Sequence, residues 1–173
     1  MKNYSIILSL ILLFVASSAI SDENITVEQI WGKREFRQNS VRGLRSMNGG
    51  KYFTKLNMVR NSIVKADYKT GEEESVFKLS NHEDVFGNEW IFDYKFSDDE
   101  SMILFSTSYE SIYRHSYKAD FYLYKRESKK LSKINDDKKI QLASFSPDGK
   151  EISYFFENNL YIYNIKSGKS NKK

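Results

Sequence analysis

The sequence has 173 residues, a formal net charge of +4 at pH 7, 12 tyrosines, 12 phenylalanines, one proline and no cysteine. A charge this small, spread along the chain, does not indicate nucleic-acid binding. Without cysteine the chain cannot form disulfides, thiolate metal sites or a thiolate nucleophile. Its aromatic content is far above that of disordered segments, so we expect one globular domain stabilised by side-chain packing.

The first 19 residues have the pattern of a secretory signal peptide. Lys2 precedes an apolar run at 6–16, and small residues follow at 17–19. The run has about half of the roughly 20 residues that a membrane-spanning helix needs. Cleavage after Ala19 is therefore favoured over a permanent membrane anchor, and we expect an exported protein, either periplasmic or secreted.

Residues 20–40 are expected to lead into the folded domain through a short helix. Thr26 and Gln29 have the spacing of a capping box, the reciprocal hydrogen bonding that starts many helices. Helical periodicity places three apolar side chains on one face. These are Val27, Ile30 and Trp31.

Three segments repeat a serine, a turn and a strand at nearly constant spacing. They are SMNGGKYF from Ser46, SDDESMILF from Ser97 and SPDGKEISYF from Ser146, which follow one another after 51 and 49 residues. Asn48-Gly49 and Asp148-Gly149 are dipeptides that two-residue hairpin turns prefer. Each repeat is therefore expected to contain a series of hairpins.

The run Phe121-Tyr122-Leu123-Tyr124 is apolar at every position, which is typical of a strand covered on both faces. A period near 50 residues with about four strands fits the blade of a β-propeller. The alternative is a β-sandwich of the same hairpins, which would leave one face of each sheet wet and give alternating polarity. We therefore predict an all-β fold, an incomplete β-propeller of about three four-stranded blades.

The predicted propeller region is 41–173, with blades at about 41–90, 91–139 and 140–173. The third blade is expected to be incomplete, because the apolar strands that close the earlier repeats, 76–79 and 131–134, have no counterpart after the last turn. Propellers typically have four to eight blades. Three blades alone are expected to leave sheet faces and edges exposed and prone to aggregation.

After the signal peptide, essentially the whole chain resembles dipeptidyl peptidase IV, a serine exopeptidase of the prolyl oligopeptidase family, and five segments carry the resemblance. The serine-turn cassettes occur in many propellers and are weak evidence for this family. The combination of ITVEQIWG with YRHSY is much more specific to it. The segments are ITVEQIWG (25–32), GLRSMNGGKYFT (43–54), FDYKFSDDESMILFST (92–107), YRHSY (113–117) and FSPDGKEISYFFENNLYIYNI (145–165).

The resemblance implies an enzyme with an N-terminal eight-bladed propeller and a C-terminal α/β-hydrolase domain that carries a Ser-Asp-His triad. The family releases dipeptides from free N-termini, with proline or alanine at the second position. The resemblance therefore implies two partners for this chain, peptides with a free N-terminus and the missing hydrolase domain. A homodimer is a further option. The sequence contains no Gly-x-Ser-x-Gly motif, so this chain alone is expected to be inactive, and no catalytic residue, metal ligand or cofactor is assigned.

The resemblance assigns one substrate-binding residue, Arg114, because the arginine of the family's Arg-His-Ser motif helps to hold the backbone carbonyl of the substrate. The alternative is a surface arginine paired with an acid such as Glu110. If 113–117 is a strand, His115 points to the opposite face and is structural. His82 is expected to be solvated. The run Glu72-Glu73-Glu74 is interpreted as a solvated turn and not as the family's glutamate pair for the substrate amino group.

A second hypothesis comes from a different class of function. The chain would then be a non-catalytic exported propeller module that binds a protein or peptide, or that completes its ring by assembly with other chains.

Overall fold

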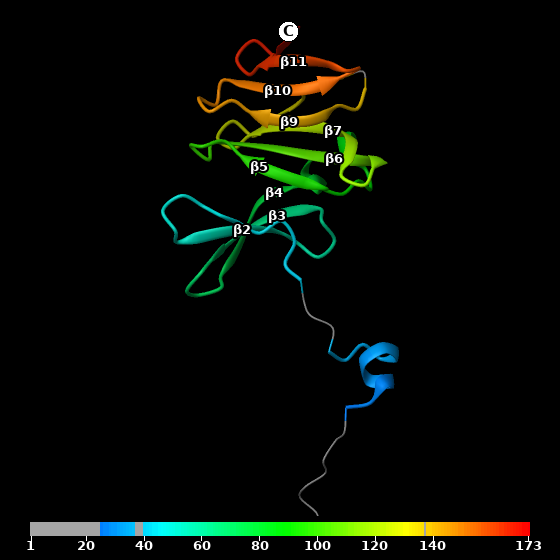
Figure 1. Cartoon of the computed structure of the whole chain (residues 1–173). Coiled ribbons are helices and arrows are strands. Elements are labelled where there is room, and N and C mark those ends of the chain that lie inside the picture. The colour runs from blue at the N-terminus through cyan, green and yellow to red at the C-terminus, as the bar shows by residue number, and fades with distance from the viewer. Residues whose placement is uncertain (1–24, 37–39, 137) are drawn as a thin grey trace, which may run out of the picture. The chain divides into compact units, whose positions relative to one another are not determined.

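The computed structural model describes residues 25–36, 40–136 and 138–173, and the chain divides into two compact units, Met1–Ser40 and Val41–Lys173 (Figure 1). The predicted signal peptide, residues 1–19, lies outside the described residues. Within the described part of the chain, no helix is both long enough and apolar enough to cross a bilayer.

The first unit contains the expected short helix, which has π geometry: η1 (Glu28–Gly32). The predicted capping box is present. The Gln29 backbone N–H donates to Thr26 Oγ1 at 3.2 Å, and the Thr26 N–H donates to Gln29 Oε1 at 2.7 Å. These bonds satisfy backbone donors that have no partner inside the helix. The side chains of Val27 and Trp31 are 74% and 78% exposed.

The second unit contains three four-stranded antiparallel sheets, each built from four strands that are consecutive in the chain. Figure 1 shows the sheets stacked in chain order. The all-β fold with three blade-like sheets is therefore confirmed. The strands of the first sheet are β1 (Arg45–Ser46), β2 (Tyr52–Leu56), β3 (Ser62–Asp67) and β4 (Glu73–Lys78).

The second sheet comes after two short helical turns and contains the two longest strands described. The helical turns are η2 (Leu79–His82) and α2 (Glu83–Phe86), and the strands are β5 (Asp93–Phe96), β6 (Met102–Tyr113), β7 (Ser116–Lys125) and β8 (Lys130–Lys133). The strands of the third sheet are β9 (Gln141–Phe145), β10 (Glu151–Phe156), β11 (Asn159–Asn164) and β12 (Lys169–Lys172).

The third sheet has four strands, so the prediction that it lacks its closing strand was wrong. Strand β12 has the sequence Lys-Ser-Asn-Lys, all four residues are exposed, and it pairs with β11 from Tyr161↔Lys172 to Asn164↔Lys169. Backbone hydrogen bonds alone define such an edge strand. A search for an apolar strand misses it because it buries no side chain.

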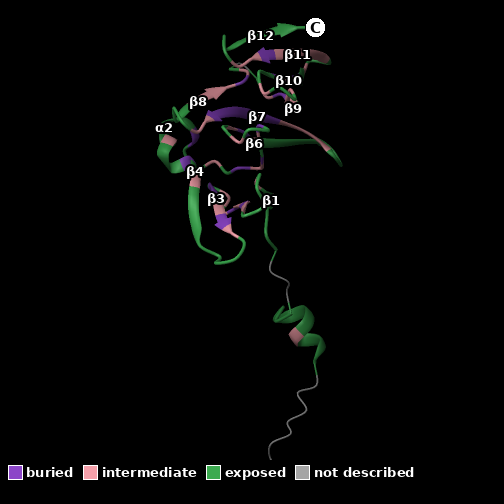
Figure 2. Ribbon diagram, turned by 90° about the vertical axis from the view of Figure 1, so that its left-hand side faces the viewer, coloured by how far each residue is buried: buried purple, intermediate pink, exposed green. Residues whose placement is uncertain are grey.

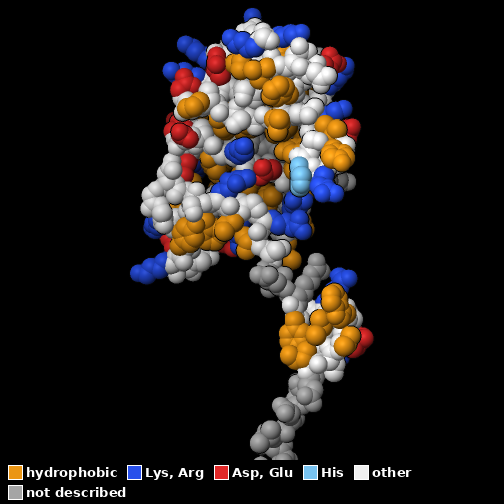
Figure 3. Space-filling view, in the orientation of Figure 1, with side chains coloured by type: hydrophobic (Ala, Val, Ile, Leu, Met, Phe, Trp, Pro, Cys, Tyr) orange, Lys and Arg blue, Asp and Glu red, His pale blue; other side chains and the backbone are white. Residues whose placement is uncertain are grey.

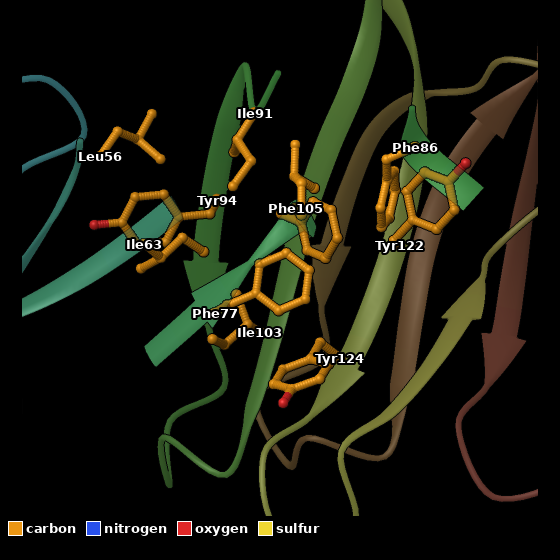
Figure 4. Close-up of a cluster of buried hydrophobic side chains, with 11 residues drawn as sticks. Leu56, Ile63, Phe77, Phe86, Ile91, Tyr94, Ile103, Phe105, Tyr122 and Tyr124 are labelled. Carbon is orange, nitrogen blue, oxygen red and sulfur yellow. The ribbon is translucent and has the colours of Figure 1, made fainter. Parts of the chain in front are cut away.

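The first and second sheets enclose an aromatic core, and residues of α2 and the preceding η2 contribute to it (Figure 4). Phe105 on β6 is 1% exposed. Its ring centroid lies 4.7 Å from that of Phe77 on β4, 5.8 Å from that of Phe86 on α2 and 5.6 Å from that of Tyr122 on β7. Burial of these side chains supplies most of the favourable free energy of docking between the two sheets.

The second sheet buries its other face against the third sheet. Leu104, Phe121 and Leu123 belong to a second core that includes Ile152 and Tyr163 of the third sheet. Neighbouring residues on β7 thus alternate between two cores, with Tyr122 and Tyr124 in the first core. The prediction that the 121–124 strand is covered on both faces is confirmed.

Tyr94 on β5 links the second sheet to the loop before β1 and to β2. The Tyr94 hydroxyl donates to the Gly43 carbonyl oxygen at 2.5 Å and lies 2.8 Å from Thr54 Oγ1. Gly43 has φ +66°, and a Cβ there would lie 2.9 Å from Tyr94 Cε1, so this close approach requires glycine. An ion pair of 2.7 Å between Arg45 Nη2 and Asp93 Oδ1 joins the same two sheets.

The serine-turn cassettes form loops that are longer than the predicted two-residue turns. The Ser146 carbonyl accepts from the Gly149 N–H at 2.9 Å, and the Ser146 N–H donates to the Glu151 carbonyl at 2.9 Å. The Asp148 carboxylate accepts from Ser146 Oγ at 2.7 Å and from the Lys150 N–H at 3.2 Å. The aspartate therefore organises a wider loop, and only the glycine has positive φ.

Asp99 has the same role in the second cassette, which leads to a prediction on pH. Hydrogen bonds from the Ser97 and Ser101 hydroxyls and the Ser101 N–H lower the pKa of Asp99 to about 2. Because this pKa is below the ordinary value of 3.8, the stabilising effect is complete above about pH 4 and is lost as the pH falls toward 2. We expect Asp99→Asn to make stability less dependent on pH across this window.

Urea midpoints at pH 7, 4 and 3 for the parent and Asp99→Asn measure this effect. Asp98→Asn is the matched control, because it removes the same charge one residue away while keeping the backbone carbonyl through which Asp98 accepts from the Asn48 side chain. Equal pH slopes for the parent and Asp99→Asn would contradict the prediction.

Candidate functional site

The hairpin of β6 and β7 extends beyond the rest of its sheet. The last pair between β5 and β6 is Asp93↔Ser106, and β8 pairs with β7 only up to Tyr122↔Lys133. Beyond Thr107, β6 pairs only with β7. Figure 2 shows this hairpin leaving the stack, with the buried part of β7 in purple and the exposed outer part of β6 in green.

Arg114 and His115 form the turn at the tip of this hairpin, between Tyr113 and Ser116, which pair with each other. Both residues are exposed. The interpretation of 113–117 as a continuous strand, with His115 packed on the opposite face, was therefore wrong. The turn replaces the alternation of a strand, and both residues are exposed at the end of the hairpin.

The Arg114 guanidinium makes no hydrogen bond or ion pair with the described residues. Glu110, the acid considered as its partner, instead forms an ion pair with Lys139, with 3.5 Å between Oε2 and Nζ. The pairing of Arg114 with Glu110 is thus absent. The Arg114 guanidinium carries five N–H donors in a planar fork.

His82 is partly buried, so the expectation of a solvated histidine was wrong. Its ring stacks on Phe77 with 5.7 Å between centroids, and it meets the edges or faces of Phe86 and Tyr124 at 6.3 and 6.2 Å. The short helix after β4 folds back over the aromatic core and carries the imidazole with it. His82 therefore has a packing role at the edge of this core.

The acidic run at 72–74 begins a strand, since Glu73 and Glu74 are the first residues of β4. Glu74 pairs with Lys65 on β3 at 3.1 Å between Oε2 and Nζ, and Glu73 pairs with Lys55 on β2. The two residues are exposed, so the interpretation as solvated is confirmed, but their interpretation as part of a turn was wrong. Their carboxylates are paired with lysines of other strands of the same sheet.

A pocket of about 650 Å³ lies at the base of the hairpin, next to the β10–β11 turn. Its lining contains carboxylates and amines but no serine or histidine among the described residues, so it does not hold the serine–histidine pair of a serine hydrolase. Figure 3 shows positive and negative side chains interspersed over one face of the molecule. Three ion pairs at this pocket are Lys133–Asp120 at 2.9 Å, Lys138–Glu157 at 2.9 Å and Lys139–Glu110 at 3.5 Å.

Aromatic side chains that sequence reasoning missed lie against the hairpin. The rings of Phe92 and Tyr109 stack with 4.1 Å between centroids and 19° between planes, and Tyr117 lies 4.9 Å from Phe92. Burial raises the pKa of Tyr117, so its hydroxyl stays neutral at ordinary pH. The sequence gives only a weak signal for this aromatic contact, because the three residues are far apart in the pattern. Phe92 precedes β5, Tyr109 lies on β6 and Tyr117 lies on β7.

Three stacked four-stranded antiparallel sheets define the second unit as a β-propeller region. Arg114 lies at the tip of its projecting hairpin. Residues 97–172 match the family model described as dipeptidyl peptidase IV (DPP IV) N-terminal region. The matched segment contains the second and third serine cassettes and the whole hairpin. The chain is similar to the N-terminal region of dipeptidyl peptidases, the family that the sequence resembles.

Curated relatives and a solved structure support this relationship. The chain is 39% identical over 75 residues to the probable dipeptidyl peptidase 4 of Arthroderma benhamiae, a match that covers 42% of this chain and 10% of the relative. It is 34% identical over 84 residues to the dipeptidyl peptidase 4 of Arthroderma otae, covering 47% and 11%. The match therefore spans about a tenth of these relatives.

The crystal structure of Porphyromonas gingivalis dipeptidyl peptidase 4 matches with a TM-score of 0.73 and 28% identity. This match covers 88% of the present chain and 22% of the chain in that crystal structure. The arrangement of the three sheets is thus shared over nearly all of the present chain.

Proposed function

We propose that this chain forms the N-terminal propeller portion of a DPP IV-like serine exopeptidase that releases X-Pro and X-Ala dipeptides from free N-termini. One observation carries the proposal: the segment that matches the family model includes a projecting hairpin whose tip presents Arg114 without a partner among the described residues. A residue kept free of internal ion pairs at an exposed tip is suited to bind a ligand.

In the proposed enzyme, Arg114 binds a backbone carbonyl near the N-terminus of the substrate. Its guanidinium offers parallel N–H donors that match an acceptor oxygen and restrict the direction of the bound peptide. Holding the substrate in this way orients the scissile bond toward the nucleophile. This chain contributes positioning, and the serine, aspartate and histidine that perform hydrolysis belong to a C-terminal α/β-hydrolase domain.

The proposal also includes the location and access of the enzyme. The apolar run and small residues at 1–19 support export to the periplasm or beyond the cell. The propeller would restrict access to the hydrolase domain, so that short free N-termini reach the nucleophile and folded proteins do not.

The test is to isolate the native product from its source cells and to measure its intact mass and its activity. The tryptic peptide 96–114, which ends at Arg114, identifies the product. A mass several times the 20.3 kDa of this chain, with release of p-nitroaniline from Gly-Pro-p-nitroanilide, is the expected result. A mass equal to or below that of this chain, without such activity, would overturn the proposal in favour of the non-catalytic binding module.

A further inference from the structure

The projecting part of the β6–β7 hairpin is a two-stranded ribbon. From Thr107 and Asp120 outward, each strand has only the other as a paired neighbour, apart from one bridge at Ala119. An isolated two-stranded hairpin is at best marginally stable in water. A fixed direction of the tip therefore requires contacts with residues outside the ribbon.

The first of these contacts is at a β-bulge where the ribbon leaves the sheet. The pairing register shifts between Thr107 and Glu110, and Ser108 has φ +50°. A bulge bends its strand and so sets the direction of the residues beyond it. The Ser108 N–H donates to Glu89 Oε2 at 3.0 Å. A carboxylate acceptor makes this a charge-assisted bond, which is stronger than a neutral one.

Glu89 is itself held by the core. Its backbone N–H donates to the Phe86 carbonyl at 2.9 Å, and the Phe86 side chain is 3% exposed. The carboxylate that holds the bulge is therefore attached to a rigid part of the fold. This attachment gives the bulge a fixed position relative to the second sheet.

The second contact is aromatic and lies on one face of the ribbon. Tyr109 on β6 and Tyr117 on β7 lie 5.3 Å apart between centroids, and both rings contact Phe92. The Phe92 N–H donates to the Ser106 carbonyl at 2.8 Å, which fixes its backbone to the sheet. Trp90 adds a further ring 6.0 Å from Phe92. The aromatic side chains thus support both strands of the ribbon at once.

The third contact comes from the segment between β8 and β9. Ala119 and Ile140 exchange two backbone hydrogen bonds, at 3.0 and 2.9 Å. The adjacent residue, Lys139, pairs with Glu110 on the opposite strand of the ribbon. The ribbon is thus contacted by the loop before β5, through Glu89 and Phe92, and by the loop after β8, through Lys139 and Ile140.

We propose that Glu89, together with the aromatic contact of Phe92 with Tyr109 and Tyr117, fixes the direction of the hairpin and so positions Arg114. This inference rests on the proposed function, because it assigns these side chains as positioning residues for substrate binding. A hydrogen-bond donor that is already oriented binds and aligns a substrate better than one on a mobile arm.

The first measurement is hydrogen exchange on the full-length product, and it does not depend on activity. Glu89→Ala is expected to raise the exchange rates of backbone amides in 108–119 by about tenfold, with little change in 102–106 or 121–124. Glu89→Gln keeps an acceptor oxygen and should retain most of the protection. Glu127→Ala, which removes the same charge at the exposed β7–β8 turn, is the matched control.

The second measurement is made on the full-length enzyme. Glu89→Ala and Tyr109→Leu should each lower kcat/KM about fivefold, mainly through KM, and should have no further effect in an Arg114→Ala background. Glu89→Gln should restore most of the loss.

The outcomes separate the two proposals. Unchanged exchange in Glu89→Ala, or losses that add to that of Arg114→Ala, would overturn the positioning role while leaving the peptidase intact. Absence of dipeptidyl peptidase activity in the unmodified native enzyme would overturn the proposed function, whatever the exchange rates show.

Discussion

Replacing Phe105 by alanine is expected to lower the free energy of unfolding of the β-sheet unit by about 3–5 kcal/mol. The side chain is 1% exposed and contacts rings from the first sheet, from α2 and from its own sheet. Removing the ring loses its transfer free energy and leaves a cavity between two sheets that cannot close fully. This loss is a large fraction of the roughly 5–15 kcal/mol that stabilises a typical domain.

Urea denaturation followed by tryptophan fluorescence would measure the change. Phe155→Ala is the matched control, because the same ring is deleted from a side chain that is 42% exposed on β10. The control should cost much less, since less apolar surface returns to water. Similar midpoints for both variants would show that the aromatic core between the first two sheets does not support the unit.

The second large effect is expected on catalysis: Arg114→Ala should lower the kcat/KM of the full-length enzyme by about one to two decades. This corresponds to the roughly 1.5–3 kcal/mol of a charge-assisted hydrogen bond. The melting temperature should stay the same, because the guanidinium has no ion pair or hydrogen bond with the described residues. Steady-state kinetics on Gly-Pro-p-nitroanilide and a thermal melt test both parts.

Two further variants sharpen this experiment. Arg114→Lys keeps the charge but loses the planar pair of donors, so it should recover only part of the loss. Lys166→Ala removes one positive charge from another exposed hairpin turn and should leave kcat/KM unchanged. An unaltered kcat/KM in Arg114→Ala would leave the tip of the hairpin without a role in substrate binding.

The sheets could be predicted from the sequence because their patterns are local. The four apolar residues at 121–124 have both faces covered, and the serine cassettes lie where β-strands turn back. The turn at Arg114 and His115 could not be predicted in this way. It contains no glycine, proline or asparagine, and neither residue has positive φ, so nothing in the segment interrupts a strand pattern.

The support of the hairpin was also beyond sequence reasoning, for a different physical reason. Glu89 and Phe92 act from a loop between two sheets, and their partners Ser108 and Tyr109 lie about 20 residues further along the chain. Such contacts depend on how the sheets dock against one another, and the hydrophobic periodicity of the sequence contains no information on docking. Arg114 itself came from resemblance to a family, and its assignment stays a prediction until the variant is measured.

Each sheet of the unit consists of strands that follow one another directly in the sequence. The backbone pairing of one sheet therefore closes only short loops, which favours rapid formation. A chain that emerges from a ribosome or an export channel N-terminus first can complete one sheet before the next has appeared. Assembly then becomes the stepwise addition of preformed layers, and the rate should depend most on the step that buries the aromatic rings between the first two sheets.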